Sequence, residues 1–186
     1  MRPRPGEVLH FSEDAGIMEF APHVARTAKE LTPAVWAVDA DNAPGYWFPR
    51  QCPRAMAWNT AKTSDSDRER ILGPHVDRVH MIEYGWLHRM QTARVFAYRF
   101  DADEFTAYGD PDEPHAYVAH HVVRPLVPAE PIGDLLELHE AAGIELRLSR
   151  SLWPWWNEVI ESSVGFSGIR LRNATAESAS SASTDG

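Results

Sequence analysis

Two short apolar runs in the first third of the chain end in side chains that can bind a ligand. The first run carries His10 and is followed by Ser12, and the second, Val35–Val38, leads to Tyr46. An imidazole and a hydroxyl can hydrogen-bond a ribose and an amide, and a tyrosine ring can stack on a flat base. These segments therefore predict the floor of a nucleotide-binding cleft.

A turn rich in proline and arginine follows the second run. Arg50 and Arg54 flank Cys52 in this turn. Guanidinium groups bind phosphates through paired N–H donors, so either arginine can hold a pyrophosphate. A lone cysteine needs a neighbouring base to act as a nucleophile, and the sequence locates none.

Each of these residues also has a purely structural interpretation. A histidine on a short apolar strand, such as His10, is often a hydrogen-bonded core residue. The ring of Tyr46 and its aromatic neighbours can equally pack in a core. The residue types alone leave both interpretations open.

Periodicity and turn residues predict the elements that position these side chains. Residues 94–100 alternate aromatic and other side chains, which is typical of a strand. Helices are predicted over 132–142 and 154–164, where apolar residues recur at helical spacing. Shorter strands are predicted at 7–11, 34–38, 54–58, 79–82, 116–120, 144–148 and 169–172. The expected architecture is an α+β domain with a mostly antiparallel sheet of about six strands and peripheral helices.

Five motifs resemble a bacterial family that is known only as a domain of unknown function. They span nearly the whole chain, from about residue 8 to residue 173. This resemblance implies a single-domain cytosolic protein and supplies no activity. The motifs are Leu9–Asp14, Tyr46–Arg54, Gly143–Arg147, Leu152–Pro154 and Phe166–Asn173.

A second resemblance is to the ADP-ribosyltransferase-like fold. His10-Phe-Ser12 is similar to the first-strand motif of that family. Trp36-Ala37, with Tyr46 nine residues after Ala37, is similar to its second motif. The resemblance implies NAD as the cofactor, held by His10, Ser12, Trp36, Tyr46, Arg50 and Arg54.

The third motif of that family is a glutamate on a later strand, and here the sequence departs from the pattern. The matching position is Ala116, and Glu113 is the carboxylate three residues away. If the chain is an enzyme, the resemblance implies ADP-ribosyl transfer or NAD glycohydrolysis by His10, Tyr46 and Glu113. The sequence leaves open whether it is an enzyme.

Two other functions fit parts of the sequence. The missing glutamate and the seven tryptophans favour a non-enzymatic domain that binds a small ligand or a protein. His115, His120 and His121 supply imidazoles for a metal such as zinc. Adjacent strand residues point to opposite faces, so at most one of the last two can join His115, and no metal is expected.

Composition sets the outer limits. The chain has 186 residues, a net charge of −9 and only two lysines, which argues against nonspecific binding to nucleic acids. A single cysteine excludes an internal disulfide, and no apolar run suits a signal peptide or a membrane span, so the cytoplasm is the expected location. One globular domain is expected over residues 1–173, with a disordered tail over residues 174–186.

Overall fold

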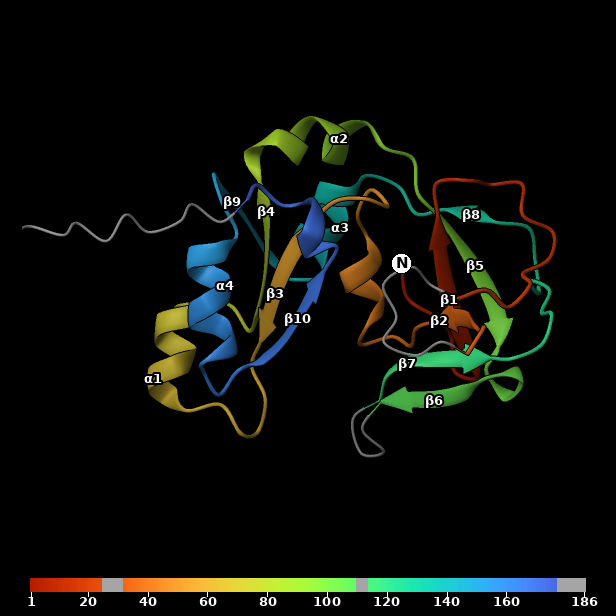
Figure 1. The fold of residues 1–186 in the computed structure, drawn as a ribbon, viewed down its shortest axis with the longest axis horizontal. Coiled ribbons are helices and arrows are strands. Elements are labelled where there is room, and N and C mark those ends of the chain that lie inside the picture. Colours follow the sequence, from red (N-terminus) through yellow and green to blue (C-terminus); the bar gives the residue numbers. More distant parts are fainter. Residues whose placement is uncertain (25–31, 110–113, 177–186) are drawn as a thin grey trace, which may run out of the picture. The chain divides into compact units, whose positions relative to one another are not determined.

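The computed structural model describes residues 1–24, 32–109 and 114–176. Within these ranges the chain forms four α-helices and ten strands in three sheets. The α+β class predicted from the sequence is therefore confirmed, and most strand pairs are antiparallel as expected. The strands divide into three sheets, however, instead of the single sheet of about six strands that the pattern predicts (Figure 1).

The chain divides into two compact units, each built from two separate segments. Unit 1 comprises Met1–Arg50 and Arg89–His139, and unit 2 comprises Gln51–His88 and Glu140–Gly186. Each unit has a core of its own, described below. The single domain expected over residues 1–173 stays a prediction.

Unit 1 contains two three-stranded antiparallel sheets, with the orders β1-β5-β8 and β2-β7-β6. An antiparallel bridge between Leu9 and Val38, with both backbone hydrogen bonds at 2.8 Å, links the two sheets through β1 and the chain after β2. The strands are β1 (Glu7–Ser12), β2 (Val35–Ala37), β5 (Phe96–Asp101), β6 (Thr106–Gly109), β7 (Pro114–Ala119) and β8 (Glu130–Pro131).

The strand β5 shows why the aromatic alternation in its sequence matters. Tyr98 and Phe100 lie on one face, where they are buried in the hydrophobic core of unit 1. Arg99 leaves the opposite face, and its Nη1 and Nε atoms lie 2.7 and 2.9 Å from carboxylate oxygens of Glu7 and Glu130. A charge this well covered is tolerated because two carboxylates compensate it.

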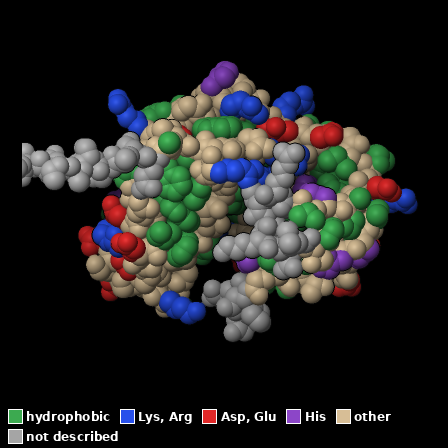
Figure 2. All heavy atoms as spheres, viewed as in Figure 1, with side chains coloured by type: hydrophobic (Ala, Val, Ile, Leu, Met, Phe, Trp, Pro, Cys, Tyr) green, Lys and Arg blue, Asp and Glu red, His purple; other side chains and the backbone are tan. Residues whose placement is uncertain are grey.

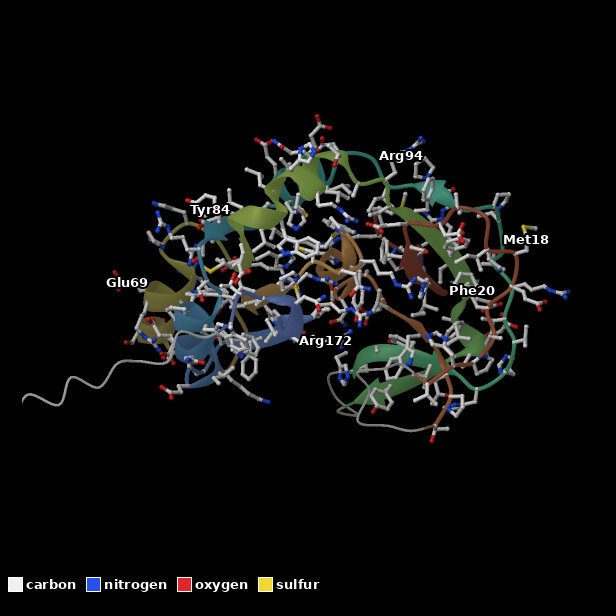
Figure 3. The ribbon with its side chains drawn as sticks, turned by 45° about the horizontal axis from the view of Figure 1, so that its top comes forward. Met18, Phe20, Glu69, Tyr84, Arg94 and Arg172 are labelled. Atoms are coloured by element: carbon white, nitrogen blue, oxygen red, sulfur yellow. The ribbon has the colours of Figure 1, made fainter. Side chains whose placement is uncertain are left out.

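Phe20 closes this core from a segment outside the strands. Its backbone pairs with Val123 through an isolated antiparallel bridge. Its ring centroid lies 5.0 Å from that of His10 and 4.9 Å from that of Tyr98. Figure 3 shows Phe20 beside the strands of unit 1, whereas Met18, two residues earlier, is 82% exposed. This contact fixes one side of the His10 imidazole.

Short helical segments complete unit 1. The segment η1 (Ala43–Tyr46) is the next element after β2, and in the turn before it the Asp39 carboxylate accepts the backbone N–H of Asn42 at 2.9 Å. The sequence predicts a helix cap at Asp39 or Asp41, but the N-cap residue is Asn42, whose side chain makes no capping hydrogen bond. The other segments are α2 (Leu87–Thr92), which begins in unit 2, η4 (Ala102–Glu104) and α3 (Leu135–Ala141), which lies inside the predicted helix 132–142.

Unit 2 contains one four-stranded sheet with the order β10-β3-β4-β9, in which only the β4–β9 pair is parallel (Figure 1). Its strands are β3 (Arg54–Trp58), β4 (Arg78–Glu83), β9 (Glu145–Ser149) and β10 (Gly165–Ile169). Its helical segments are α1 (Asp65–Asp67), η2 (Arg68–Leu72), η3 (Tyr84–Trp86), α4 (Trp153–Ile160) and η5 (Leu171–Asn173).

The helix α4 packs on this sheet through Trp155, Trp156 and Val159. The helical spacing predicts Ile160 on the inner face of this helix, but its side chain is 44% exposed. The buried residue of the helix is the preceding one, Val159. The last strand also begins earlier than the predicted range 169–172, at Gly165.

Figure 2 shows Lys and Arg side chains interspersed with Asp and Glu on the face in view, rather than gathered in one basic patch. Among the described residues, no helix combines the length and the apolar character that crossing a membrane would require.

Candidate ligand-binding site

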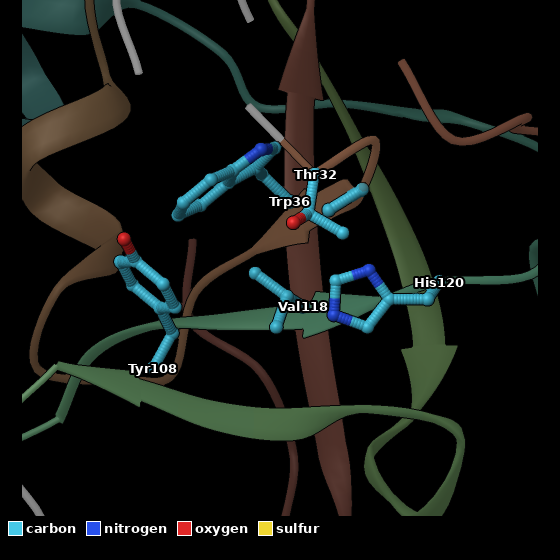
Figure 4. Close-up of a pocket in the computed structure, with 6 residues that line it drawn as sticks. Thr32, Trp36, Tyr108, Val118 and His120 are labelled. Carbon is cyan, nitrogen blue, oxygen red and sulfur yellow. The ribbon is translucent and has the colours of Figure 1, made fainter. Parts of the chain in front are cut away.

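A pocket of about 230 Å³ opens in unit 1, on the sheet that contains β2, β7 and β6 (Figure 4). It differs from the cleft predicted between the first two apolar runs, because only Trp36 belongs to both. Three separate segments of the chain contribute to it. Its lining residues are Thr32, Ala34, Trp36, Tyr108, Val118 and His120.

Strand pairing brings the pocket residues together. Trp36 pairs directly with Val118 across β2 and β7, and Tyr108 pairs with Ala116 across β7 and β6. Side chains at paired or diagonal positions of a sheet share a face and lie within contact distance. The Trp36 and Tyr108 rings accordingly meet edge to face, with centroids 4.8 Å apart at 78°.

The opposite side of the pocket is polar. His120 directly follows β7, and its Nδ1 atom lies 2.9 Å from the backbone carbonyl oxygen of Pro33. Figure 4 shows the imidazole facing the space in front of Trp36 and Tyr108. The pocket therefore combines an aromatic wall with the hydrogen-bonding side chains of His120 and Thr32.

His10 lies next to this pocket through the backbone of Trp36. Its Nδ1 atom is 2.8 Å from the Trp36 carbonyl oxygen, and its side chain is half-buried. Burial lowers the pKa of His10, and the positive charge of Arg50 lowers it further, although the hydrogen bond to Trp36 acts in the opposite direction. The neutral imidazole is therefore favoured, which suits a hydrogen-bonding role.

Ser12 and Tyr46 contact other parts of the unit. Ser12 is buried, and its Oγ atom accepts the backbone N–H of Asp14 at 3.1 Å. The Tyr46 ring lies parallel to Phe11, with centroids 6.4 Å apart. Phe11 follows His10 in an extended strand, so the two leave opposite faces of β1. Tyr46 therefore packs on the face of β1 opposite His10.

The two turn arginines have different environments. Arg50 is exposed, and its backbone N–H donates to a carboxylate oxygen of Glu13 at 3.4 Å. Arg54 belongs to unit 2 and is buried, and its Nη1 atom donates to the Cys52 carbonyl at 3.0 Å. Of the two, Arg50 presents its side chain to solvent. Glu113, the predicted carboxylate, lies outside the described residues.

Sequence reasoning did not assign Tyr108 and His120 to a ligand pocket. His120 attracts attention only as a member of the histidine cluster considered for a metal. In the part of the chain that the structure describes, no group of three or more histidine, cysteine or acidic side chains is arranged to hold a metal ion. Tyr108 precedes β7 and His120 follows it. This order predicts a shared pocket only once β2 is known to pair with β7.

The fold and the pocket define an α+β protein with a small aromatic site beside the half-buried His10. The chain belongs to a family of unknown function, DUF6886, whose family model matches residues 9–174. This confirms the membership of an uncharacterised family that the five motifs predict. No curated protein and no solved structure matches the chain.

Proposed function

We propose that unit 1 binds a nucleotide of the NAD class, with one planar base in the pocket between the aromatic pair and His120. The observation that carries this proposal is the edge-to-face pair of Trp36 and Tyr108, whose centroids lie 4.8 Å apart at the mouth of a pocket. Aromatic walls contribute roughly 1–3 kcal/mol per stacked base and accept any base.

The size of the pocket limits what it can hold. Its volume of about 230 Å³ lies below the ~300–1,000 Å³ of sites that enclose a drug-sized ligand. One ring system fits this volume, and a whole dinucleotide does not. The ribose and phosphates would therefore extend from the pocket along the surface, where the exposed Arg50 is the candidate among the turn arginines for a phosphate contact.

Binding without transfer is the form of this proposal that the site supports best. The six described residues that line the pocket include no carboxylate, and cleavage of the glycosidic bond calls for a negative group near the developing cation. The position at which the family carries its glutamate is Ala116 in this sequence, which also favours binding without transfer. Catalysis by His10, Tyr46 and Glu113 would make the chain an ADP-ribosyltransferase or NAD glycohydrolase.

Isothermal titration of the full chain with NAD, ADP-ribose and AMP tests the proposal. We expect all three to bind with affinities within about tenfold of one another, because only one base enters the pocket. Tyr108→Ala should weaken binding about tenfold or more, by loss of one stacking partner. Tyr84→Ala is the matched control, since Tyr84 is 59% exposed in unit 2.

The absence of heat with every nucleotide at millimolar concentration would overturn the proposal. An equal loss of binding in Tyr108→Ala and Tyr84→Ala would move the site away from the pocket. The same samples are assayed for free nicotinamide. Its release from NAD, abolished by His10→Ala and Tyr46→Ala, would assign the enzymatic activity that the resemblance implies.

A further inference from the structure

The hydrogen bond between His120 and Pro33 determines which ring nitrogen of the imidazole carries the proton. The Nδ1 atom lies 2.9 Å from the carbonyl oxygen of Pro33. A carbonyl oxygen only accepts hydrogen bonds, so Nδ1 must be the donor. In a neutral imidazole with its hydrogen on Nδ1, the Nε2 atom carries a lone pair and accepts.

This acceptor faces the pocket. In Figure 4 the imidazole edge that bears Nε2 is turned toward the space bounded by Trp36 and Tyr108. Within the described part of the chain, Nε2 has no hydrogen-bond partner. The other lining side chains are those of Ala34, Trp36, Val118 and Tyr108, which are largely apolar or aromatic, and that of Thr32, which carries a hydroxyl.

A ligand ring that enters this pocket meets the Nε2 lone pair on one edge, and elsewhere the Thr32 hydroxyl and apolar or aromatic side chains. His120 is exposed, and a ring that presents a second lone pair to Nε2 would displace its water without replacing the hydrogen bond, which is unfavourable. A ring with an N–H donor on the facing edge would satisfy the imidazole. The carbonyl of Pro33 therefore makes His120 Nε2 an acceptor, whereas the Thr32 hydroxyl can donate or accept.

We propose that the pocket selects planar heterocycles that carry an amino group on their edge, with His120 Nε2 as the acceptor for that group. This inference rests on the proposed function, because it names the feature of the base that the same pocket recognises. Adenine is the simplest base of this kind. His120 is then a specificity residue, while Trp36 and Tyr108 supply the stacking surface.

Two-dimensional ¹H–¹⁵N NMR of the full chain at pH 8 tests the inference. The indole N–H signal of Trp36 is assigned by its absence in Trp36→Phe and followed during titration. The probes are adenine, purine and N6,N6-dimethyladenine, each methylated at N9 so that the amino group of adenine supplies the only N–H donors among them. Purine lacks the amino group and is smaller, whereas the dimethyl compound lacks the donor and is larger, so size and donor effects separate.

We expect adenine to bind about 3- to 10-fold more tightly than either analogue, the range that one net hydrogen bond gives. His120→Leu should abolish this preference while purine still shifts the Trp36 signal. His120→Gln, which can present an amide oxygen as acceptor, should restore part of it. His121→Leu is the matched control, because the adjacent side chain is exposed and does not line the pocket.

Equal affinity of the wild-type chain for the three purines would overturn the inference and leave the proposed function standing. A preference for adenine that persists in His120→Leu would also overturn it. If no purine shifts the Trp36 signal, the proposed function fails together with the inference.

Discussion

The Nδ1 atom of His10 donates a hydrogen bond to the backbone carbonyl oxygen of Trp36 at 2.8 Å, and this contact joins the first two motifs of the sequence. The carbonyl can only accept, so Nδ1 of His10 is the donor. The strand β1 thereby holds the backbone of the residue whose side chain forms the aromatic wall of the pocket. Changes at His10 should therefore affect both stability and the pocket.

Replacement of His10 should reduce the loss of stability in mild acid. The folded-state pKa of His10 is lowered, chiefly by burial, so below the unfolded value of about 6.5 the unfolded chain binds more protons. The free energy of unfolding should therefore fall from pH 7.5 to 5.5 in the wild type. His10→Gln, which keeps a donor for Trp36, should show a smaller fall.

Urea unfolding at the two pH values measures this difference. The change attributable to His10 should stay below about 1.4 kcal/mol for each pKa unit of the shift. His75→Gln, at an exposed position, is the control and should keep the wild-type pH dependence. Identical slopes for His10→Gln and the wild type would show that His10 does not contribute.

Asp67 should make unit 2 sensitive to strong acid. Hydrogen bonds from the Oγ and backbone N–H of Ser163, at 2.7 and 2.8 Å, and from Arg70 at 2.7 Å hold the pKa of Asp67 well below its ordinary value. A carboxylate with a lowered pKa stabilises the fold above the unfolded pKa, and this contribution is lost as pH falls through the folded value.

Asp67→Asn should therefore flatten the dependence of stability on pH between pH 5 and 2. Thermal unfolding followed by circular dichroism across this range measures the effect. Asp65→Asn is the control from the same short helix, at an exposed position. A wild-type pH profile in Asp67→Asn would contradict the prediction.

The buried carboxylate of Glu83 should make Thr175 important for stability. Glu83 is 5% exposed at the end of β4, and the backbone N–H and hydroxyl of Thr175 donate to it at 3.0 Å. Hydrogen bonds to charged groups contribute roughly 1.5–3 kcal/mol. Thr175→Ala should lower the free energy of unfolding by about that amount, whereas Thr175→Ser, which keeps the hydroxyl, should cost little.

This contact also bears on the C-terminal tail. The sequence predicts that the tail starts at residue 174. In the structure the Trp153 indole N–H donates a hydrogen bond to the Thr175 carbonyl at 2.7 Å. The packed chain therefore continues to this residue, and residues 177–186 lie outside the described ranges. Denaturant unfolding of the two Thr175 variants measures the effect, and equal stability of the alanine and serine variants would contradict it.

Gly165 should be intolerant of any side chain. A Cβ atom at this position would lie 2.7 Å from Cε2 of Trp58 and 2.8 Å from a methyl carbon of Thr60. Gly165→Ala therefore forces the Trp58 ring to move, and overpacking of this kind costs about 1–3 kcal/mol. Gly85→Ala is the matched control, because nothing lies within 4 Å of its added Cβ.

Chemical denaturation compares the two alanine variants. Gly165→Ala should unfold at a lower denaturant concentration than the wild type, and Gly85→Ala should stay close to it. Equal midpoints for the two variants would show that the Trp58 side chain moves aside without loss of stability.

Local patterns predicted the elements whose own sequence carries a clear period. The alternation of β5 and the apolar stripe of α3 are of this kind. The strand β8 was missed because it has two residues, one of them a proline, and β6 because its side chains are mostly exposed. The start of β10 was missed because Gly165 and Gly168 make room for tryptophan rings from elsewhere in unit 2.

The sequence by itself determined the α+β class and the family. It also indicated that the short apolar strands that carry His10 and Trp36 lie together. Only the tertiary structure decided which side chains share a site. It placed Tyr46 on the face of β1 opposite His10, and it joined Trp36 to Tyr108 and His120. The physical reason is strand pairing, since the register between β2, β7 and β6 sets the face and the neighbours of each side chain, and the β2–β7 pairing joins segments far apart in the chain.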